Sequence, residues 1–476
     1  MKRWLLFLPA MLFGCPQFAP DDVCGYPGFC DGSIDNDSGK DGSTTCPSGK
    51  EPKDDPNCVT DTLGIFVAPA PTGNDANAGT KTAPVATLKA ALQKVGAKSF
   101  IFVCEGSYSE SVDIKQSAVI FGGFKCSDWS YSATSIPKFT ATKPDYVFHL
   151  EGSNDTVIGD LELDAMDGGA GTGQSSVGAM IVASQNVKLE RVTIHAGKGA
   201  DAPAGLLTNF TFPDAGALHG NDAVGNAGGA ANVVNCPGGI STTGGKGGDT
   251  GLDGQDGLPA LTGGLHGDGG TACSAGASGA AGTKGADGQG AQSAGTVGDA
   301  GWAPTSGGDG KVGGPGQGGG GGGGITAGVN SGGGGGGGAG GCGGAGGGGG
   351  SGGGGSIAII AINAKLTVAT STLSCASGGT GGNGVAGQAG DPVSGAHGNG
   401  SAFGCTAGNG GPGATGGAGG GGAGGSSIAV LSSGGSVTLD TATQSSITVA
   451  TQGGAKGTGP AGNDGIVGVA QATLAL

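Results

Sequence analysis

One arginine and the acidic residues near it carry the clearest potential for catalysis in this chain. Apart from the arginine at position 3, Arg191 is the only arginine, and its acidic neighbours are Glu162, Asp164, Asp167 and Glu190. Carboxylates can hold calcium, and an arginine that gave up its proton could act as a general base. The set therefore keeps calcium-assisted base catalysis open, against the alternative that it is a solvated acidic edge.

Other catalytic and binding motifs are absent or uninformative. Gly349–Gly353 matches a nucleophile elbow only because a polyglycine tract matches any glycine motif, and no phosphate-binding Gly-Lys-Ser/Thr occurs. The histidines are scattered and show no metal-ligand spacing with cysteine: His149, His195, His219, His266 and His397. We therefore expect no catalytic residue, no cofactor and no metal site.

The composition limits the elements that could position any site. Glycine accounts for 118 of 476 residues and aromatic residues for only 4%, so one large conventional core is excluded. The net charge of −15 disfavours binding to phosphate backbones, and we expect no nucleic-acid partner.

The start of the chain resembles a bacterial lipoprotein signal peptide. Lys2 and Arg3 precede an apolar run from Trp4 to Phe13, and Leu12-Phe13-Gly14-Cys15 ends it. The resemblance implies a signal peptide at 1–14, with Cys15 lipidated as the new first residue. By the same resemblance, Pro16 rather than aspartate implies a lipid anchor in the outer membrane. We also expect exposure at the cell surface. The alternative is an ordinary secretory peptide.

Twelve cysteines in an exported chain indicate disulfides. Four of them lie in an acidic tether at 15–62 and predict two bridges with three possible connectivities: Cys24, Cys30, Cys46 and Cys58. Asp35, Asp37 and Asp41 hint at a calcium loop there, but the pattern is incomplete, so a solvated linker is the preferred interpretation. One cysteine is left over among Cys236, Cys273, Cys342, Cys375 and Cys405.

From residue 63 the sequence predicts many short strands and one early helix. The helix is expected at 84–95, and the strands at 65–67, 100–103, 112–114, 119–121, 147–150, 156–163, 180–183 and 187–194. This pattern fits either a β-sandwich or a solenoid.

A motif near the helix favours the solenoid. Residues 73–80, Gly-Asn-Asp-Ala-Asn-Ala-Gly-Thr, followed by Ala-Pro-Val-Ala-Thr-Leu at 83–88, resemble the opening of a family of bacterial surface domains. The resemblance covers roughly 64–200 and implies an all-β, right-handed parallel β-helix related in fold to pectate lyases, without one assigned activity. Enzymes similar to pectate lyases use an arginine base and calcium-binding carboxylates, so the resemblance keeps a polysaccharide lyase or hydrolase open at Arg191. Cys104 and Cys126 are then about one turn apart, and we expect them to form a disulfide.

An internal repeat extends the solenoid to the end of the chain. Related pairs of strands begin at Ser175, Ser356 and Ser426. Each pair has too few residues to bury its apolar face alone, so we expect the pairs to stack on one another. This organisation predicts a β-helix stem at 63–200, a glycine-rich insertion at 201–355, and further turns at 356–476 with a second insertion at 376–425.

The glycine tracts allow two interpretations. Flexible loops follow from the entropy cost of ordering glycine. Alternatively, the absence of Cβ atoms lets extended left-handed segments bond backbone to backbone, and the tracts resemble glycine-rich domains of the PGRS type, for which such packing is expected.

We expect a non-enzymatic surface lipoprotein with a structural or adhesive role, whose partners are the membrane, through its lipid, and extracellular polysaccharide or other envelope components. The alternative is a β-helix protein that binds or degrades polysaccharide.

Overall fold

A computed structural model describes residue 46 and residues 49–476 of the chain. Within these residues the fold is mostly β, with one 3-10 helix, η1 (Pro56–Cys58), and three short α-helices: α1 (Leu88–Lys94), α2 (Ala215–Leu218) and α3 (Thr441–Ser445). The helix expected at 84–95 is shorter because Thr87 caps it, its side chain accepting a hydrogen bond from the Ala90 amide (3.1 Å). Across the described residues, no helix has the length and apolar character needed to cross a membrane.

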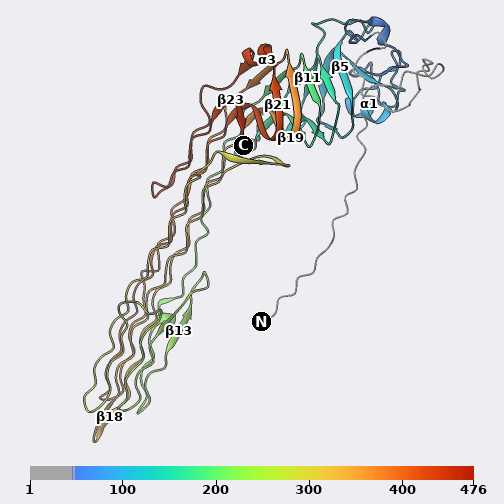
Figure 1. The fold of residues 1–476 in the computed structure, drawn as a ribbon. Coiled ribbons are helices and arrows are strands. Elements are labelled where there is room, and N and C mark those ends of the chain that lie inside the picture. The colour runs from blue at the N-terminus through green and yellow to red at the C-terminus, as the bar shows by residue number, and fades with distance from the viewer. Residues whose placement is uncertain (1–45, 47–48) are drawn as a thin grey trace, which may run out of the picture. The chain divides into compact units, whose positions relative to one another are not determined.

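The largest element is a sheet of eleven strands whose pairings are all parallel. Its strands are β1 (Gly64–Val67), β2 (Phe100–Cys104), β4 (Val112–Ile114), β5 (Val119–Phe124), β7 (Tyr146–Glu151), β8 (Val157–Gly159), β10 (Ser176–Val182), β11 (Val187–Glu190), β19 (Ser356–Ala369), β21 (Ser427–Leu439) and β23 (Ala470–Ala475). The long strand β19 pairs with β10 through its first half and with β11 through its second half. Two successive strands, β10 and β11, thus align with the single longer strand β19. The sheet as a whole is curled (Figure 1).

A second, six-stranded parallel sheet runs beside the first. It contains β3 (Gly106–Ser109), β6 (Pro137–Thr140), β9 (Glu162–Asp164), β12 (Thr193–Ala196), β20 (Thr372–Cys375) and β22 (Ile447–Thr448). Between β2 and β22, each pass of the chain, meaning one circuit through both sheets, thus adds strands to both of them. Two residues form the corner between the sheets, and the first of them lies in the left-handed region at Asp160 (φ 57°), Arg191 (φ 52°) and Thr370 (φ 51°).

The three predicted repeats lie side by side and parallel. Val187 pairs with Leu366, and Leu366 pairs with Val437. Alternate side chains of both sheets meet in one apolar core, including Leu189, Ile194 and Leu373, which are at most 2% exposed. The prediction that distant segments share an interior is therefore confirmed.

The glycine tracts leave the sheets at one recurring position, after a strand of the smaller sheet and before the next strand of the larger one. Residues 197–355 lie between β12 and β19, residues 376–426 between β20 and β21, and residues 449–469 between β22 and β23. Three hairpins interrupt the first tract: β13 (Asn232–Asn235) with β14 (Ser241–Gly244), β15 (Gly295–Gly298) with β16 (Gly301–Pro304), and β17 (Ile325–Ala327) with β18 (Asn330–Gly332).

The tracts are ordered by hydrogen bonds between their backbones, and we call this part of the fold the glycine bundle. The amides of Gly307, Gly310, Gly313 and Gly316 donate to the carbonyls of Gly350, Gly347, Gly344 and Gly341, at 2.8–2.9 Å. Donors at every third residue indicate an extended helix with three residues per turn, as in polyproline II. Figure 1 shows these segments running side by side towards the β17–β18 hairpin. Of the two interpretations of the tracts, packed segments are the one observed.

Contact between neighbouring backbones explains why these positions are glycine. A Cβ atom at Gly321 would lie 2.0 Å from the Lys246 carbonyl oxygen, and one at Gly319 would lie 2.0 Å from the Gly408 oxygen. Real Cβ contacts are essentially never shorter than 3.0 Å. The close packing of the bundle therefore requires glycine at these points.

Four disulfides tie the described residues together. They are Cys46–Cys58, Cys104–Cys126, Cys236–Cys342 and Cys273–Cys405. Cys104–Cys126 links β2 to the residues just after β5, the neighbouring strand, and the last two bridges lie within the glycine bundle. The left-over cysteine is Cys375 on β20, a buried free thiol. Cys15, Cys24, Cys30 and the suggested calcium loop at 35–41 lie outside the described residues.

Candidate functional site

Arg191, the candidate base, is enclosed by carboxylates. Its guanidinium lies 3.0 Å from Asp160, 2.9 Å from Glu51 and 3.2 Å from Glu190. The Asp160 and Glu190 side chains are only 3% and 5% exposed. Asp160 and Arg191 are the corner residues of two successive passes, and Glu51 precedes β1.

The electrostatics of this cluster favour a permanently charged arginine. Burial alone would lower the pKa of Arg191, but its hydrogen bond to Asp160 and the charges of Asp160, Glu190 and Glu51 raise it above the ordinary value. Burial works to raise the pKa of Glu190, yet Lys188 and Arg191 hold it below the ordinary value. Arg191 is accordingly a poor general base and a good ion-pair partner.

The other acidic residues named with Arg191 lie in different surroundings. Glu162 and Asp164 on β9 bind Lys138 of β6, at 3.0 and 2.8 Å. Asp167 accepts a hydrogen bond from the Lys198 amide at 2.6 Å. The structure therefore does not gather these carboxylates around Arg191.

Two other groups of side chains in the described residues could take part in proton transfer or hold a metal ion. The Nδ1 atom of His195 on β12 lies 2.5 Å from the Ser374 hydroxyl of β20, on the outer side of the smaller sheet. In the glycine bundle, Asp253, His266 and Asp268 place one potential metal-ligand atom each within 4.8 Å of one another, and all three are exposed.

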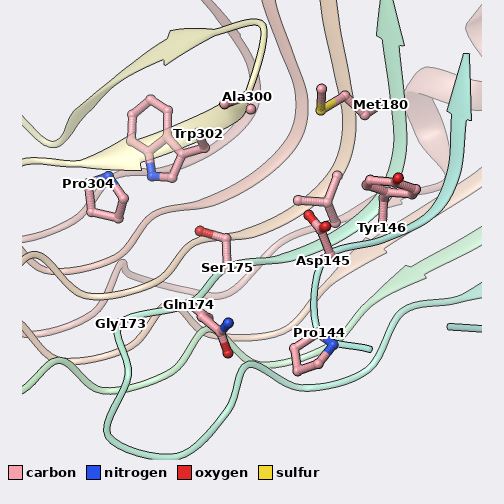
Figure 2. Close-up of a pocket in the computed structure, with 12 residues that line it drawn as sticks. Pro144, Asp145, Tyr146, Gly173, Gln174, Ser175, Met180, Ala300, Trp302 and Pro304 are labelled. Atoms are coloured by element: carbon pink, nitrogen blue, oxygen red, sulfur yellow. The ribbon is translucent and has the colours of Figure 1, made fainter. Parts of the chain in front are cut away.

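A pocket lies where the glycine bundle meets the larger sheet. It has a volume of about 300 Å³. Figure 2 shows Trp302 and Pro304 of the β15–β16 hairpin on one side, Asp145 and Tyr146 on the other, and Ser175 between them. Pro144, Gly173, Gln174, Val177, Met180, Ala300 and Gly301 complete the lining.

The indole of Trp302 is firmly seated in this pocket. A Cβ at Gly295 would lie 2.4 Å from the ring, so glycine at that position makes room for it. The side chain packs in an apolar cluster on the outer face of the larger sheet, with Met180 and Ile357 among its members. Trp302 is 8% exposed. Within the described residues its Nε1 atom is one of two buried side-chain polar atoms without a hydrogen-bond partner.

The opposite wall of the pocket is also fixed. The Tyr146 hydroxyl donates to Asp113 Oδ1 at 2.9 Å, and His149 Nδ1 lies 3.0 Å from the same oxygen. Burial and the Asp113 carboxylate raise the pKa of Tyr146 to about 12, so the phenol is neutral at physiological pH. The Tyr146 ring is thereby held in one orientation.

A wider groove of about 620 Å³ lies within the bundle, between residues 203–210 and the glycine segments around Gly310 and Gly348. Backbone and small side chains provide most of its surface. It contains no buried polar side-chain atom that lacks a partner among the described residues.

One comparison with known proteins gives a match. A family model described as "Protein of unknown function (DUF1565)" matches residues 71–120, which run from before α1 into β5. The match includes the motif at 73–88, and the family is associated with parallel β-helix proteins. No curated protein and no solved structure matches the chain.

The sequence alone does not predict the pocket. The clearest sign of the pocket in the sequence is Trp302 itself, a large aromatic residue inside a tract composed mostly of small residues. Tyr146 and Asp145 precede a predicted strand at 147–150, but nothing in the sequence indicates that residues more than 150 positions apart line one cavity.

Proposed function

We propose that this protein is a non-enzymatic lipoprotein of the outer membrane, with a structural or adhesive role at the cell surface. In this proposal Cys15 carries the lipid, the acidic segment up to residue 62 is a tether, and the two parallel sheets close into a right-handed β-helix. The glycine bundle provides the surface that meets other envelope components.

One observation carries the proposal: the glycine tracts are cross-linked by backbone hydrogen bonds and two disulfides instead of forming separate loops. Ordering so many glycine residues is costly, and a regular hydrogen-bonded bundle offsets that cost. At about 3.1 Å per residue, the segment 305–324 reaches roughly 60 Å. Such a bundle suits display or contact at a distance from the sheets.

The state of Arg191 supports a non-enzymatic role over the lyase or hydrolase alternative. A lyase base must lose its proton, whereas the carboxylates around Arg191 stabilise the charged form. Binding of polysaccharide without turnover is fully compatible with the proposal.

Two measurements test it. The Cys15→Ser chain should lose acyl labelling and leave the membrane fraction, while Pro16→Ala, the matched control, should keep both. Retention of label by the Cys15→Ser chain would overturn the anchor. Separately, the purified chain incubated with a panel of polysaccharides should release no reducing ends and no unsaturated products, and turnover of any of them would overturn the non-enzymatic role.

A further inference from the structure

The unpartnered indole N–H of Trp302 is the feature that singles out the pocket. A buried donor without an acceptor costs about 1–3 kcal/mol. The N–H of Trp129, a buried tryptophan elsewhere in the chain, donates to the Lys81 carbonyl at 3.1 Å. Trp302 therefore differs from Trp129 in keeping a free donor, and Figure 2 shows its nitrogen on the side of the ring nearest Pro304 and Ser175.

The charges beside the pocket restrict the chemistry of a ligand. Asp145 is part of the lining, and a carboxylate there disfavours an anion. Lys143 lies 3.4 Å from the Asp145 carboxylate and its ammonium stands 5.1 Å from the centre of the Tyr146 ring. A cation already occupies the places where a cationic ligand would bind. The pocket is therefore suited to a neutral molecule.

The lining also specifies the shape of that molecule. The aromatic rings of Trp302 and Tyr146 and the side chains of Pro304 and Met180 offer apolar surface. The Asp145 carboxylate, the Gln174 amide and the free Trp302 N–H offer acceptors and donors around it. A pyranose ring has C–H faces that pack on aromatic rings and hydroxyls that both donate and accept.

We infer that this pocket binds one ring of a neutral polysaccharide, with a ring hydroxyl accepting a hydrogen bond from Trp302 Nε1. The inference deepens the proposed adhesive role and rests on it. The site is preformed, because Gly295 and the apolar cluster seat the indole and Asp113 holds Tyr146.

The test compares two identical substitutions in the full chain. Trp302→Phe keeps an aromatic ring and removes the N–H, so the affinity for a neutral glycan should fall about tenfold, which corresponds to about 1.4 kcal/mol. Its thermal stability should fall somewhat, because the smaller ring leaves space in the apolar cluster around Trp302, but no hydrogen bond is lost. Trp129→Phe should lower stability more, because it loses both packing and its bond to Lys81, and it should leave glycan affinity unchanged.

Calorimetry with glucan, mannan and galactan, beside polygalacturonate and choline, distinguishes the outcomes. Binding of a neutral glycan that depends on Trp302 supports the inference. Preferential binding of polygalacturonate or choline would overturn the ligand class. Neutral-glycan binding that Trp302→Phe does not weaken would overturn the pocket and leave the adhesive role standing. Binding of no glycan would overturn the inference, and attachment of cells bearing or lacking the protein to a surface would then decide the adhesive role.

Discussion

Replacing a central glycine of the bundle by alanine tests whether its backbones are packed as described. A Cβ added at Gly321 meets the Lys246 oxygen at 2.0 Å and the Lys246 carbonyl carbon at 2.5 Å. Relief of this overlap requires the two segments to separate by about 1 Å or more. The bonds from Gly245 N to Gly319 O and from Gly248 N to Gly322 O, both 2.9 Å, would then stretch to about 4 Å and be lost.

The cost follows from those two bonds. Each of the two buried hydrogen bonds costs about 1–3 kcal/mol to lose, so Gly321→Ala should destabilise this part of the bundle by about 2–6 kcal/mol. In hydrogen exchange followed by mass spectrometry, amides of residues 313–325 should exchange about 30-fold to about 20,000-fold faster than in the parent chain. The effect should be local, because the sheets do not share these hydrogen bonds.

Gly216→Ala provides the matched control. Gly216 lies in α2, and a Cβ there has nothing within 4 Å. Alanine at this helical position should leave exchange in residues 313–325 unchanged and stabilise the helix slightly, by about 0.5–1 kcal/mol. Unchanged exchange in the Gly321→Ala protein, or free-peptide exchange of these amides in the parent chain, would refute the packed bundle.

Two further substitutions probe the sheets. Arg191→Met leaves the buried carboxylates of Asp160 and Glu190 without their cation and should lower the free energy of unfolding by about 3–5 kcal/mol in urea titrations. Lys115→Met breaks an exposed ion pair and should have no measurable effect. Equal losses of stability in the two variants would contradict the proposed importance of burial. Burial raises the pKa of the Cys375 thiol to about 12, so its ionisation should lower stability as the pH rises from about 9 towards 12, by at most about 1.4 kcal/mol per pH unit. Cys375→Ala should remove that part of the slope, and an identical slope in the variant would assign it to other groups.

The sign of the Cys375 effect follows from the two states of the thiol. In the unfolded chain it ionises near its ordinary pKa of 9.0, while in the folded chain it stays protonated to about 12. Between these values the folded state binds more protons, so stability falls as the pH rises. The same burial should protect the thiol from alkylation at pH 8 until the protein unfolds.

The sequence predicted the strands of the fold better than its corners. The segment 112–114 was predicted with the observed bounds of β4, and the strand expected at 100–103 is β2. The runs expected at 156–163 and 187–194 are each divided in two, by Asp160 and by Arg191. Both corner residues have positive φ without being glycine, and arginine rarely adopts this region, so local sequence preference gives no sign of the corner at Arg191.

The candidate site was less predictable than the fold. Of the carboxylates expected beside Arg191, only Glu190 contacts it, and its other partners, Asp160 and Glu51, were not associated with it. The pocket depends on a hairpin at 295–304 that seats Trp302 against the face of strands 120 or more residues earlier. Such contacts arise from the path of the insertion, which a single sequence does not specify.

The spacing of glycine nevertheless records how deeply each segment of the bundle is buried. Segments with glycine at every third position, such as 276–288, contact neighbours mainly on one face and expose their other residues. The segment 318–324 is glycine at every position, and a Cβ on any of its residues would lie within 2.2 Å of a carbonyl oxygen from another segment. A three-residue turn has three faces, so continuous glycine indicates a segment enclosed on all of them. Bulky substitutions should therefore be tolerated between the glycines at 276–288 and excluded throughout 318–324.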